Sequence, residues 1–226
     1  MLTQLVIFDL DGTLIDSLGD LADAMNAVLD TRRFPVHPLD SYRHFVGNGI
    51  EMLVRRALPS AVVNESNVAE FVGLMREEYS TRWLATTRPF PQIPELLATL
   101  LSRKIQTAVL SNKPDSSTRT LVGQLFPDHP FVSVRGERNG VPRKPDPTST
   151  LEIISELEVS PQKTVFVGDT PIDITTGTKA GARTVGVAWG FREAHELLDA
   201  GADHVIHRPL ELLGFLEGTT RGEARP

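Results

Sequence analysis

One ten-residue stretch near the start of the chain, LVIFDLDGTL at residues 5–14, constrains the fold more than any other. Its apolar half has the length of a β-strand, and the polar residues and glycine that follow are typical of a tight turn after a buried strand. Side chains two apart on a strand point the same way, so Asp9 and Asp11 should emerge close together where the strand ends. Two carboxylates placed there repel each other unless a cation lies between them or one keeps its proton. A bound cation is the simplest of these solutions.

The overall composition is that of a globular protein and excludes several classes of function. The chain has 226 residues, enough for one sizeable α/β domain and a smaller one. Its formal net charge of −6 argues against a nucleic-acid partner, which normally meets a basic surface. The chain has no cysteine, which excludes disulfides and thiolate sites and suits a cytoplasmic location. No apolar run reaches the ~18 residues of a membrane span, so no membrane partner is expected, and the apolar N-terminus is interpreted as a core strand rather than a signal peptide.

Apolar residues at helical spacing dominate residues 17–85, where we expect helices near 18–29, 39–46, 50–58 and 68–84. Ser17, with Asp20 three residues later, is typical of a helix start. The proline-rich segment 86–94 predicts a linker. We therefore expect residues 1–16 and 86–226 to form a core domain and residues 17–85 to form an inserted helical cap domain, which should lie over the end of the first strand.

Strands and helices alternate after the linker. Strands are expected at 105–110, 131–134, 164–167, 184–187 and 204–206, and helices at 95–103, 116–125, 148–157, 172–180 and from 209, before a polar tail at 218–226 that should fray. This alternation predicts an α/β fold with a Rossmann-like, doubly wound parallel sheet, whose ligand site lies beyond the carboxyl ends of the strands. Asp9 and Asp11, Ser111 and Asn112, and Asp169 all follow strands. We expect them to meet at one edge of the sheet.

The residue types expected at this edge favour phosphoryl transfer. Carboxylates without a neighbouring His or Cys suit Mg²⁺, which binds few carboxylates together with substrate phosphate. Ser111, Asn112 and Lys144 supply donors for anionic oxygens, and Gly12 allows backbone N–H groups to approach closely. Positioning and charge neutralisation do most of the catalysis in phosphoryl transfer, and a carboxylate can be the attacking group.

Four segments together resemble the motifs of the haloacid dehalogenase superfamily, in order and at plausible spacing. They are Asp9-Leu10-Asp11-Gly12-Thr13, Ser111-Asn112, Lys144-Pro145 and Gly168-Asp169-Thr170-Pro171-Ile172-Asp173. The resemblance covers nearly the whole chain. A single DxDGT segment is only suggestive, whereas the four together are highly specific.

The resemblance implies a role for each matching residue. Asp9 would be the nucleophile that takes the phosphoryl group, and Asp11 the acid that protonates the leaving oxygen and then the base that activates water. The Asp9 and Asp169 side chains and the Asp11 backbone carbonyl would hold Mg²⁺. Gly12, Ser111 and Lys144 would bind the phosphate group, with support from Asn112. Thr13 and Asp173 would lie just outside the reacting groups.

Further segments resemble the phosphoglycolate phosphatases within the superfamily. These are Val46-Gly47-Asn48-Gly49, Arg88-Pro89-Phe90-Pro91, Asn112-Lys113-Pro114 and Trp189-Gly190-Phe191. The resemblance implies a small phosphorylated metabolite as substrate and a monomer or homodimer as the assembly. Pyrophosphatases, sugar-phosphate phosphatases and β-phosphoglucomutases stay open as alternatives. Asp11 argues against dehalogenases and the absence of a cap lysine against phosphonatases, while a non-catalytic regulator that binds a phosphorylated ligand would not need both Asp9 and Asp11.

Simpler interpretations stay open for some of these residues. Asp173 also suits the first turn of a helix. Lys144 and the neighbouring Arg143 could form a solvated loop pair, or Arg143 could share the role of Lys144. In the cap, Arg43, Gly47 and Asn48 are candidates for substrate contact. An ordinary helix break explains Gly47 and Asn48 equally well, and a solvated helix face explains Arg43 better.

Overall fold

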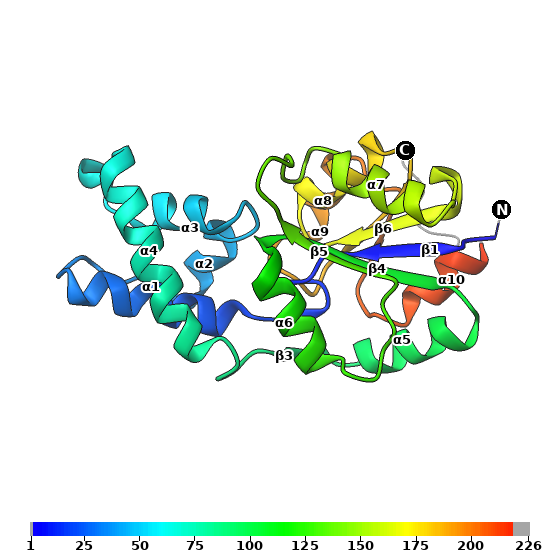
Figure 1. Ribbon diagram of the computed structural model, residues 1–226, viewed down its shortest axis with the longest axis horizontal. Helices are drawn as coiled ribbons and strands as arrows, with labels where there is room; N and C mark the ends of the chain where they lie inside the picture. The colour runs from blue at the N-terminus through cyan, green and yellow to red at the C-terminus, as the bar shows by residue number, and fades with distance from the viewer. Residues whose placement is uncertain (1, 219–226) are drawn as a thin grey trace. The chain divides into compact units, whose positions relative to one another are not determined.

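The computed structural model describes residues 2–218, so residues 219–226 of the expected tail at 218–226 lie outside the described residues (Figure 1). The described chain divides into two compact units. One comprises residues 2–14 and 89–218, and the other is Ile15–Arg88. No helix among the described residues combines the length and apolar character that crossing a bilayer requires.

A six-stranded parallel sheet forms the centre of the first unit, in the order β5-β4-β1-β6-β7-β8. The strands are β1 (Leu5–Phe8), β4 (Gln106–Pro114), β5 (Ser133–Glu137), β6 (Thr164–Gly168), β7 (Arg183–Val187) and β8 (His204–Ile206). The predicted α/β fold with a doubly wound parallel sheet is therefore confirmed. In the register, Phe8 lies beside Val109 of β4 and Val167 of β6, so the residues after β1 lie between the ends of two neighbouring strands.

Helices cover both faces of this sheet. They are α5 (Ile93–Ser102), α6 (Asp115–Leu125), α7 (Thr148–Glu156), α8 (Pro171–Lys179), α9 (Ala194–Asp199) and α10 (Glu211–Glu217), with a short 3₁₀ turn, η2 (Pro161–Lys163). In Figure 1, α5 and α6 lie on one side of the sheet and α7 and α8 on the other. All four residues of β1 are buried, because a central strand covered on both faces has no solvent-facing side.

The second unit is helical. It contains α1 (Leu18–Thr31), α2 (Leu39–Phe45), α3 (Ile50–Ala57), η1 (Ser60–Val62) and α4 (Glu65–Arg82). Apolar side chains from these helices, including Met25, Leu53 and Met75, are fully buried in its core. The two-residue strands β2 (Ile15–Asp16) and β3 (Arg88–Pro89) form a small separate sheet where the chain passes between the two units.

Asp20, in the first turn of α1, joins the two ends of the second unit. Its carboxylate accepts hydrogen bonds at 2.6–3.1 Å from the backbone N–H and the hydroxyl of both Thr86 and Thr87. The helix start predicted from Ser17 and Asp20 is confirmed, because α1 begins at Leu18 with Ser17 as its N-cap and Asp20 in its first turn. Asp16 Oδ1 accepts from Leu18 N at 3.3 Å, whereas the Asp20 carboxylate binds donors far away in the sequence.

We expect the free energy of unfolding of the Asp20→Ala variant at pH 7 to be lower by about 3 kcal/mol, because donors on Thr86 and on the buried Thr87 lose a charged acceptor. Burial alone would raise the pKa of Asp20, but these hydrogen bonds outweigh burial and lower the pKa below 3.8. A lowered pKa in the folded state stabilises the fold above the unfolded-state pKa, so the difference from the parent should shrink as the pH falls below 4.

Urea denaturation at pH 7 and pH 3 measures both effects. The matched control is Asp23→Asn, on an exposed position of the same helix, which should change the free energy of unfolding by less than ~0.5 kcal/mol. An Asp20→Ala variant as stable as this control would show that the threonine contacts contribute nothing.

Candidate active site

Asp9 follows β1 directly and is held by the backbone on two sides. Its N–H donates to Val167 O at 2.9 Å, which extends the β1–β6 pairing by one step. Its Oδ1 accepts from Leu10 N at 2.6 Å. The carboxylate is only 7% exposed, so the strand delivers a charged group into an interior position. Such a position requires other charges or donors nearby.

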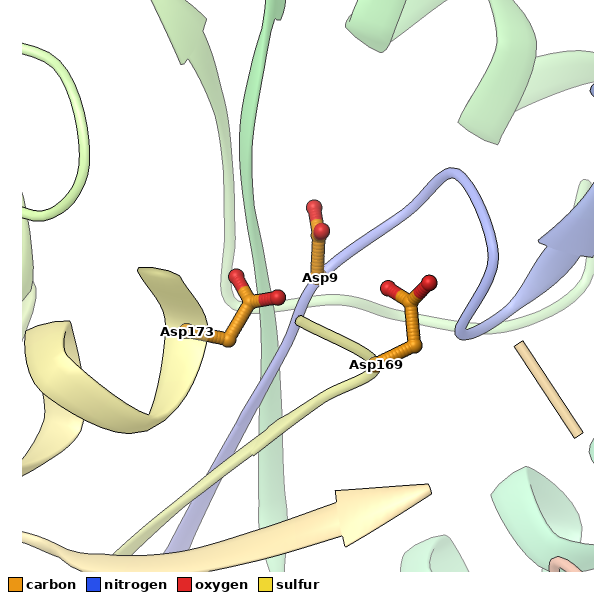
Figure 2. Close-up of side chains that lie close together, drawn as sticks. All are labelled: Asp9, Asp169 and Asp173. Atoms are coloured by element: carbon orange, nitrogen blue, oxygen red, sulfur yellow. The ribbon is translucent and has the colours of Figure 1, made fainter. Parts of the chain in front are cut away.

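Three carboxylates gather at this point. Asp9 follows β1, Asp169 follows β6, and Asp173 lies in the first turn of α8 (Figure 2). Each contributes an oxygen atom, and these atoms all lie within 4.8 Å of one another. Asp169 and Asp173 are fully buried. The convergence of separate strand ends therefore occurs at the carboxyl edge of the sheet.

The loop after β1 and the loop after β7 fix Asp169. Thr13 Oγ1 donates to Asp169 Oδ1 at 3.2 Å, and Phe191 N donates to Oδ2 at 2.8 Å. Gly12, with φ +85°, lies so close that a Cβ atom there would be 2.2 Å from Asp169 Oδ2. A side chain at position 12 would therefore displace the carboxylate, which explains why the turn needs glycine.

Asp173 caps α8 and also binds a lysine. Its Oδ2 accepts from Thr170 N at 3.1 Å and from Thr170 Oγ1 at 2.7 Å, as part of a capping box. Its Oδ1 accepts from Lys144 Nζ at 2.7 Å. Asp173 therefore lies in the first turn of α8 and is also a neighbour of Lys144.

Lys144 brings a positive charge into the cluster. Its Nζ lies 2.8 Å from Asp9 Oδ1 and 2.7 Å from Asp173 Oδ1, and the residue is buried. Asn112 ties the loop that carries Lys144 to the end of β4, because its amide donates to Lys144 O at 3.1 Å and accepts from Lys144 N at 3.0 Å. The neighbouring Arg143 lies 3.5 Å from Glu137 instead, so it does not share this position.

The electrostatics of the cluster follow from burial and crowding. Burial, reinforced by the charge of Asp173, raises the pKa of Asp9 from 3.8 to about 7, although Lys144 and the N–H of Leu10 oppose the shift. Burial, together with Asp173 and Asp9, raises the pKa of Asp169 well above its ordinary range. Burial lowers the pKa of Lys144, but the two carboxylates beside it outweigh burial and raise the pKa, so the ammonium stays charged.

This donor set fits a divalent cation such as Mg²⁺. All the ligand atoms are oxygens, and buried carboxylates with raised pKa values would gain stability from a further positive charge. Asp9, Asp169 and Asp173 each offer one oxygen to this group, so these are the residues that could hold the ion.

Asp11 lies outside the three-carboxylate cluster and has its own lysine. Lys113 Nζ is 3.1 Å from both Asp11 Oδ1 and Asp11 Oδ2. Asp9 and Asp11 each contact a separate ammonium group, from Lys144 and Lys113 respectively. Lys113 was noted only as part of a resemblance, so this contact is one that sequence reasoning missed.

The segment after β7 is a second omission of the sequence analysis. Trp189 Nε1 donates to Thr13 O at 3.1 Å, and the Phe191 N–H donates to Asp169, so this segment holds the turn after β1 and the end of β6. Backbone donors have no residue-type signature, and Trp189 and Phe191 were noted in the sequence only as part of a resemblance.

The remaining predicted residues are placed as follows. Ser111 is buried at the end of β4, where its Oγ accepts from Lys113 N at 3.2 Å. Arg43, Gly47 and Asn48 belong to the other compact unit, where Arg43 Nε lies 3.7 Å from Asp40 Oδ1. Their contact with a substrate stays a prediction.

Comparison with known proteins gives consistent matches over almost the whole chain. A model of the haloacid dehalogenase-like hydrolase family matches residues 6–187. A phosphoglycolate phosphatase from Psychrobacter arcticus is 35% identical over 201 residues, covering 86% of this chain and 87% of the relative. One from Aquifex aeolicus is 30% identical over 214 residues, covering 95% and 97%. A crystal structure from Lactobacillus delbrueckii subsp. bulgaricus, itself assigned only provisionally as a phosphoglycolate phosphatase, matches with a TM-score of 0.90 at 29% identity and covers 96% of this chain and 99% of its own.

Proposed function

The chain belongs to the haloacid dehalogenase-like hydrolases, and from this premise we propose that it is a Mg²⁺-dependent phosphatase of small phosphomonoesters, with 2-phosphoglycolate as its preferred substrate. The relatives named phosphoglycolate phosphatases support the substrate. One observation carries the chemistry: two aspartates at the end of one strand, Asp9 and Asp11, contact separate lysines. Each can therefore have a separate task within one reaction.

In the first step, an Asp9 oxygen attacks phosphorus and forms an aspartyl-phosphate as the phosphorus–oxygen bond to the alcohol breaks. Asp11, entering as the carboxylic acid, gives its proton to the departing oxygen. Lys144 contacts Asp9 and can neutralise charge on the phosphoryl oxygens, while Asn112 holds the Lys144 loop in place.

In the second step, the Asp11 carboxylate takes a proton from a water molecule whose oxygen attacks phosphorus, and Asp9 is released as a carboxylate. Bound Mg²⁺, held by the Asp9 and Asp169 side chains and the Asp11 carbonyl, would supply further charge neutralisation for the phosphoryl group. Thr13 and the Phe191 N–H orient Asp169 for this role, and Asp173 orients Lys144.

The test is a panel of 2-phosphoglycolate, pyrophosphate and hexose phosphates, ranked by kcat/KM from phosphate release with excess Mg²⁺. We expect 2-phosphoglycolate to exceed the others by at least ~10-fold, since a site that pairs with a substrate anion discriminates strongly against analogues that lack it. Similar kcat/KM values for all the substrates would overturn the assignment of 2-phosphoglycolate. The absence of phosphate release from every substrate would overturn the assignment as a phosphatase.

Metal dependence is tested on the same enzyme. After treatment with EDTA and removal of the chelator, kcat/KM should fall by at least ~100-fold and recover when Mg²⁺ is added, because the phosphoryl charge is then no longer neutralised. An enzyme that keeps its activity in EDTA would contradict the assignment of Asp9 and Asp169 as metal ligands.

A further inference from the structure

The contact between Lys113 and Asp11 has no role in the two reaction steps described above. The Lys113 ammonium is equidistant from both oxygens of Asp11, at 3.1 Å, so the contact is bidentate. The two side chains are 7% and 15% exposed, for Lys113 and Asp11 respectively. A charged contact so shielded from water is stronger and more directional than a surface ion pair.

An irregularity at the end of β4 gives Lys113 this position. Leu110 pairs with Arg135 and Pro114 pairs with Glu137, so four steps along β4 match two along β5. In a regular strand, neighbouring side chains point to opposite faces. Extra residues in one strand break this alternation and redirect side chains. Within this irregular stretch, Asn112 binds the Lys144 loop and Lys113 binds Asp11.

The backbone of Lys113 is held firmly. Its N–H donates to Ser111 Oγ at 3.2 Å, and its carbonyl accepts from Thr118 Oγ1 at 3.2 Å. Gly136 on β5 packs against it so closely that a Cβ atom there would lie 2.4 Å from Lys113 O. The ammonium therefore extends from a fixed base, whereas Asp11 precedes Gly12 in a turn.

We propose that Lys113 is the positioning residue for Asp11, and that it holds this carboxyl group on the leaving-group side of the site during both proton transfers, the first from the acid and the second to the carboxylate. The inference rests on the proposed function, in which Asp11 protonates the ester oxygen as the phosphorus–oxygen bond breaks and later takes a proton from the attacking water. Lys113 forms and breaks no bond in either step. Because it acts through Asp11, its contribution should depend on how much the leaving group needs a proton.

Two substrates that differ in how much their leaving group needs a proton distinguish a positioning role for Lys113 from a structural or substrate-binding role. Ethyl phosphate has no carboxylate, and its ethoxide is a poor leaving group that needs a proton. The nitrophenolate of p-nitrophenyl phosphate is a good leaving group that departs without one. We expect Lys113→Met to lower kcat for ethyl phosphate by ~30–100-fold with KM within ~3-fold, and to lower kcat for p-nitrophenyl phosphate by less than ~5-fold. Lys113→Arg, which keeps the charge, should recover most of the loss. The matched control is Lys179→Met, at an exposed position on α8, which should behave as the parent.

A double-mutant cycle identifies the residue through which Lys113 acts. In an Asp11→Asn background, Lys113→Met should lower kcat for ethyl phosphate by no more than ~3-fold further, because the group it positions is already lost. Lys113→Gln replaces Lys113→Met in both measurements if the methionine variant does not fold. Parent activity on either ester tests the proposed function separately, so its failure is distinguishable from that of the inference.

Three outcomes would overturn the inference. Equal losses on the two substrates would show a general structural role. Additive losses in the double mutant would show that Lys113 acts independently of Asp11. A rise in KM for 2-phosphoglycolate alone, with both other substrates unaffected, would show that Lys113 binds the substrate carboxylate instead.

Discussion

Replacing Asp9 by asparagine should reduce phosphate release by at least ~10⁴-fold, because the amide oxygen cannot form the aspartyl-phosphate, and the neighbouring Asp173 carboxylate already accepts hydrogen bonds from Lys144 and Thr170. The loss should appear in kcat for every substrate of the panel, including those with good leaving groups. This pattern separates loss of the nucleophile from loss of proton transfer, which affects poor leaving groups most.

The fold of the Asp9→Asn variant should survive. Burial and the neighbouring Asp173 make the charged form of Asp9 unfavourable, so a neutral isostere removes repulsion as well as attraction. We expect a melting temperature within ~3 °C of the parent, with Asp128→Asn, at an exposed position, as the control that retains both stability and activity. Full turnover by a correctly folded Asp9→Asn enzyme would mean that the nucleophile is a different residue.

The fold was largely predictable because the central strands carry an unusually clear signal. Leu5–Phe8 and Thr164–Gly168 are buried at every position, so their apolar runs end abruptly at polar residues. The two-residue strands β2 and β3 and the short helix α9 were not predicted. Segments this short carry too few residues for a period of 2 or 3.6 to emerge, and their structure depends on contacts distant in the sequence.

The candidate site was predictable where side-chain chemistry and strand ends coincide. Asp9 and Asp169 come together because their strands are neighbours and parallel. The alternation of elements implied that the strands are parallel, but not which of them are neighbours. The contact between Lys113 and Asp11 was not predictable, because it depends on the register shift at the end of β4. Equally, the Phe191 N–H donor to Asp169 carries no signature in the residue type.

Asp20 shows a different limit of local reasoning. Its position three residues after Ser17 is consistent with a helix start, yet its carboxylate binds Thr86 and Thr87 at the far end of the unit. A side chain with several possible donors takes the set that tertiary structure brings closest. Sequence spacing identifies only the donors within the same turn.

Replacing Lys144 by methionine should destabilise the metal-free protein by about 3–5 kcal/mol, because the variant loses the ammonium that lies between Asp9 and Asp173 and leaves buried carboxylates uncompensated. The same change should lower kcat/KM by ~10²–10³-fold, since Lys144 contacts the proposed nucleophile and would contact the phosphoryl oxygens. Lys179→Met serves as the control for replacing a lysine by methionine.

The cause of the destabilisation can be read from its pH dependence in EDTA. A carboxyl group whose pKa is higher in the folded state than in the unfolded state, as for Asp9 and Asp169, favours folding more as the pH falls toward the unfolded-state value. Without Lys144 these pKa values should rise further, so protonation at pH 5.5 should relieve most of the penalty measured by urea denaturation at pH 8. An equal loss of unfolding free energy at both pH values would attribute the effect to the packing of the lysine side chain rather than to its charge, and would remove the electrostatic basis for assigning Lys144 to the phosphate site.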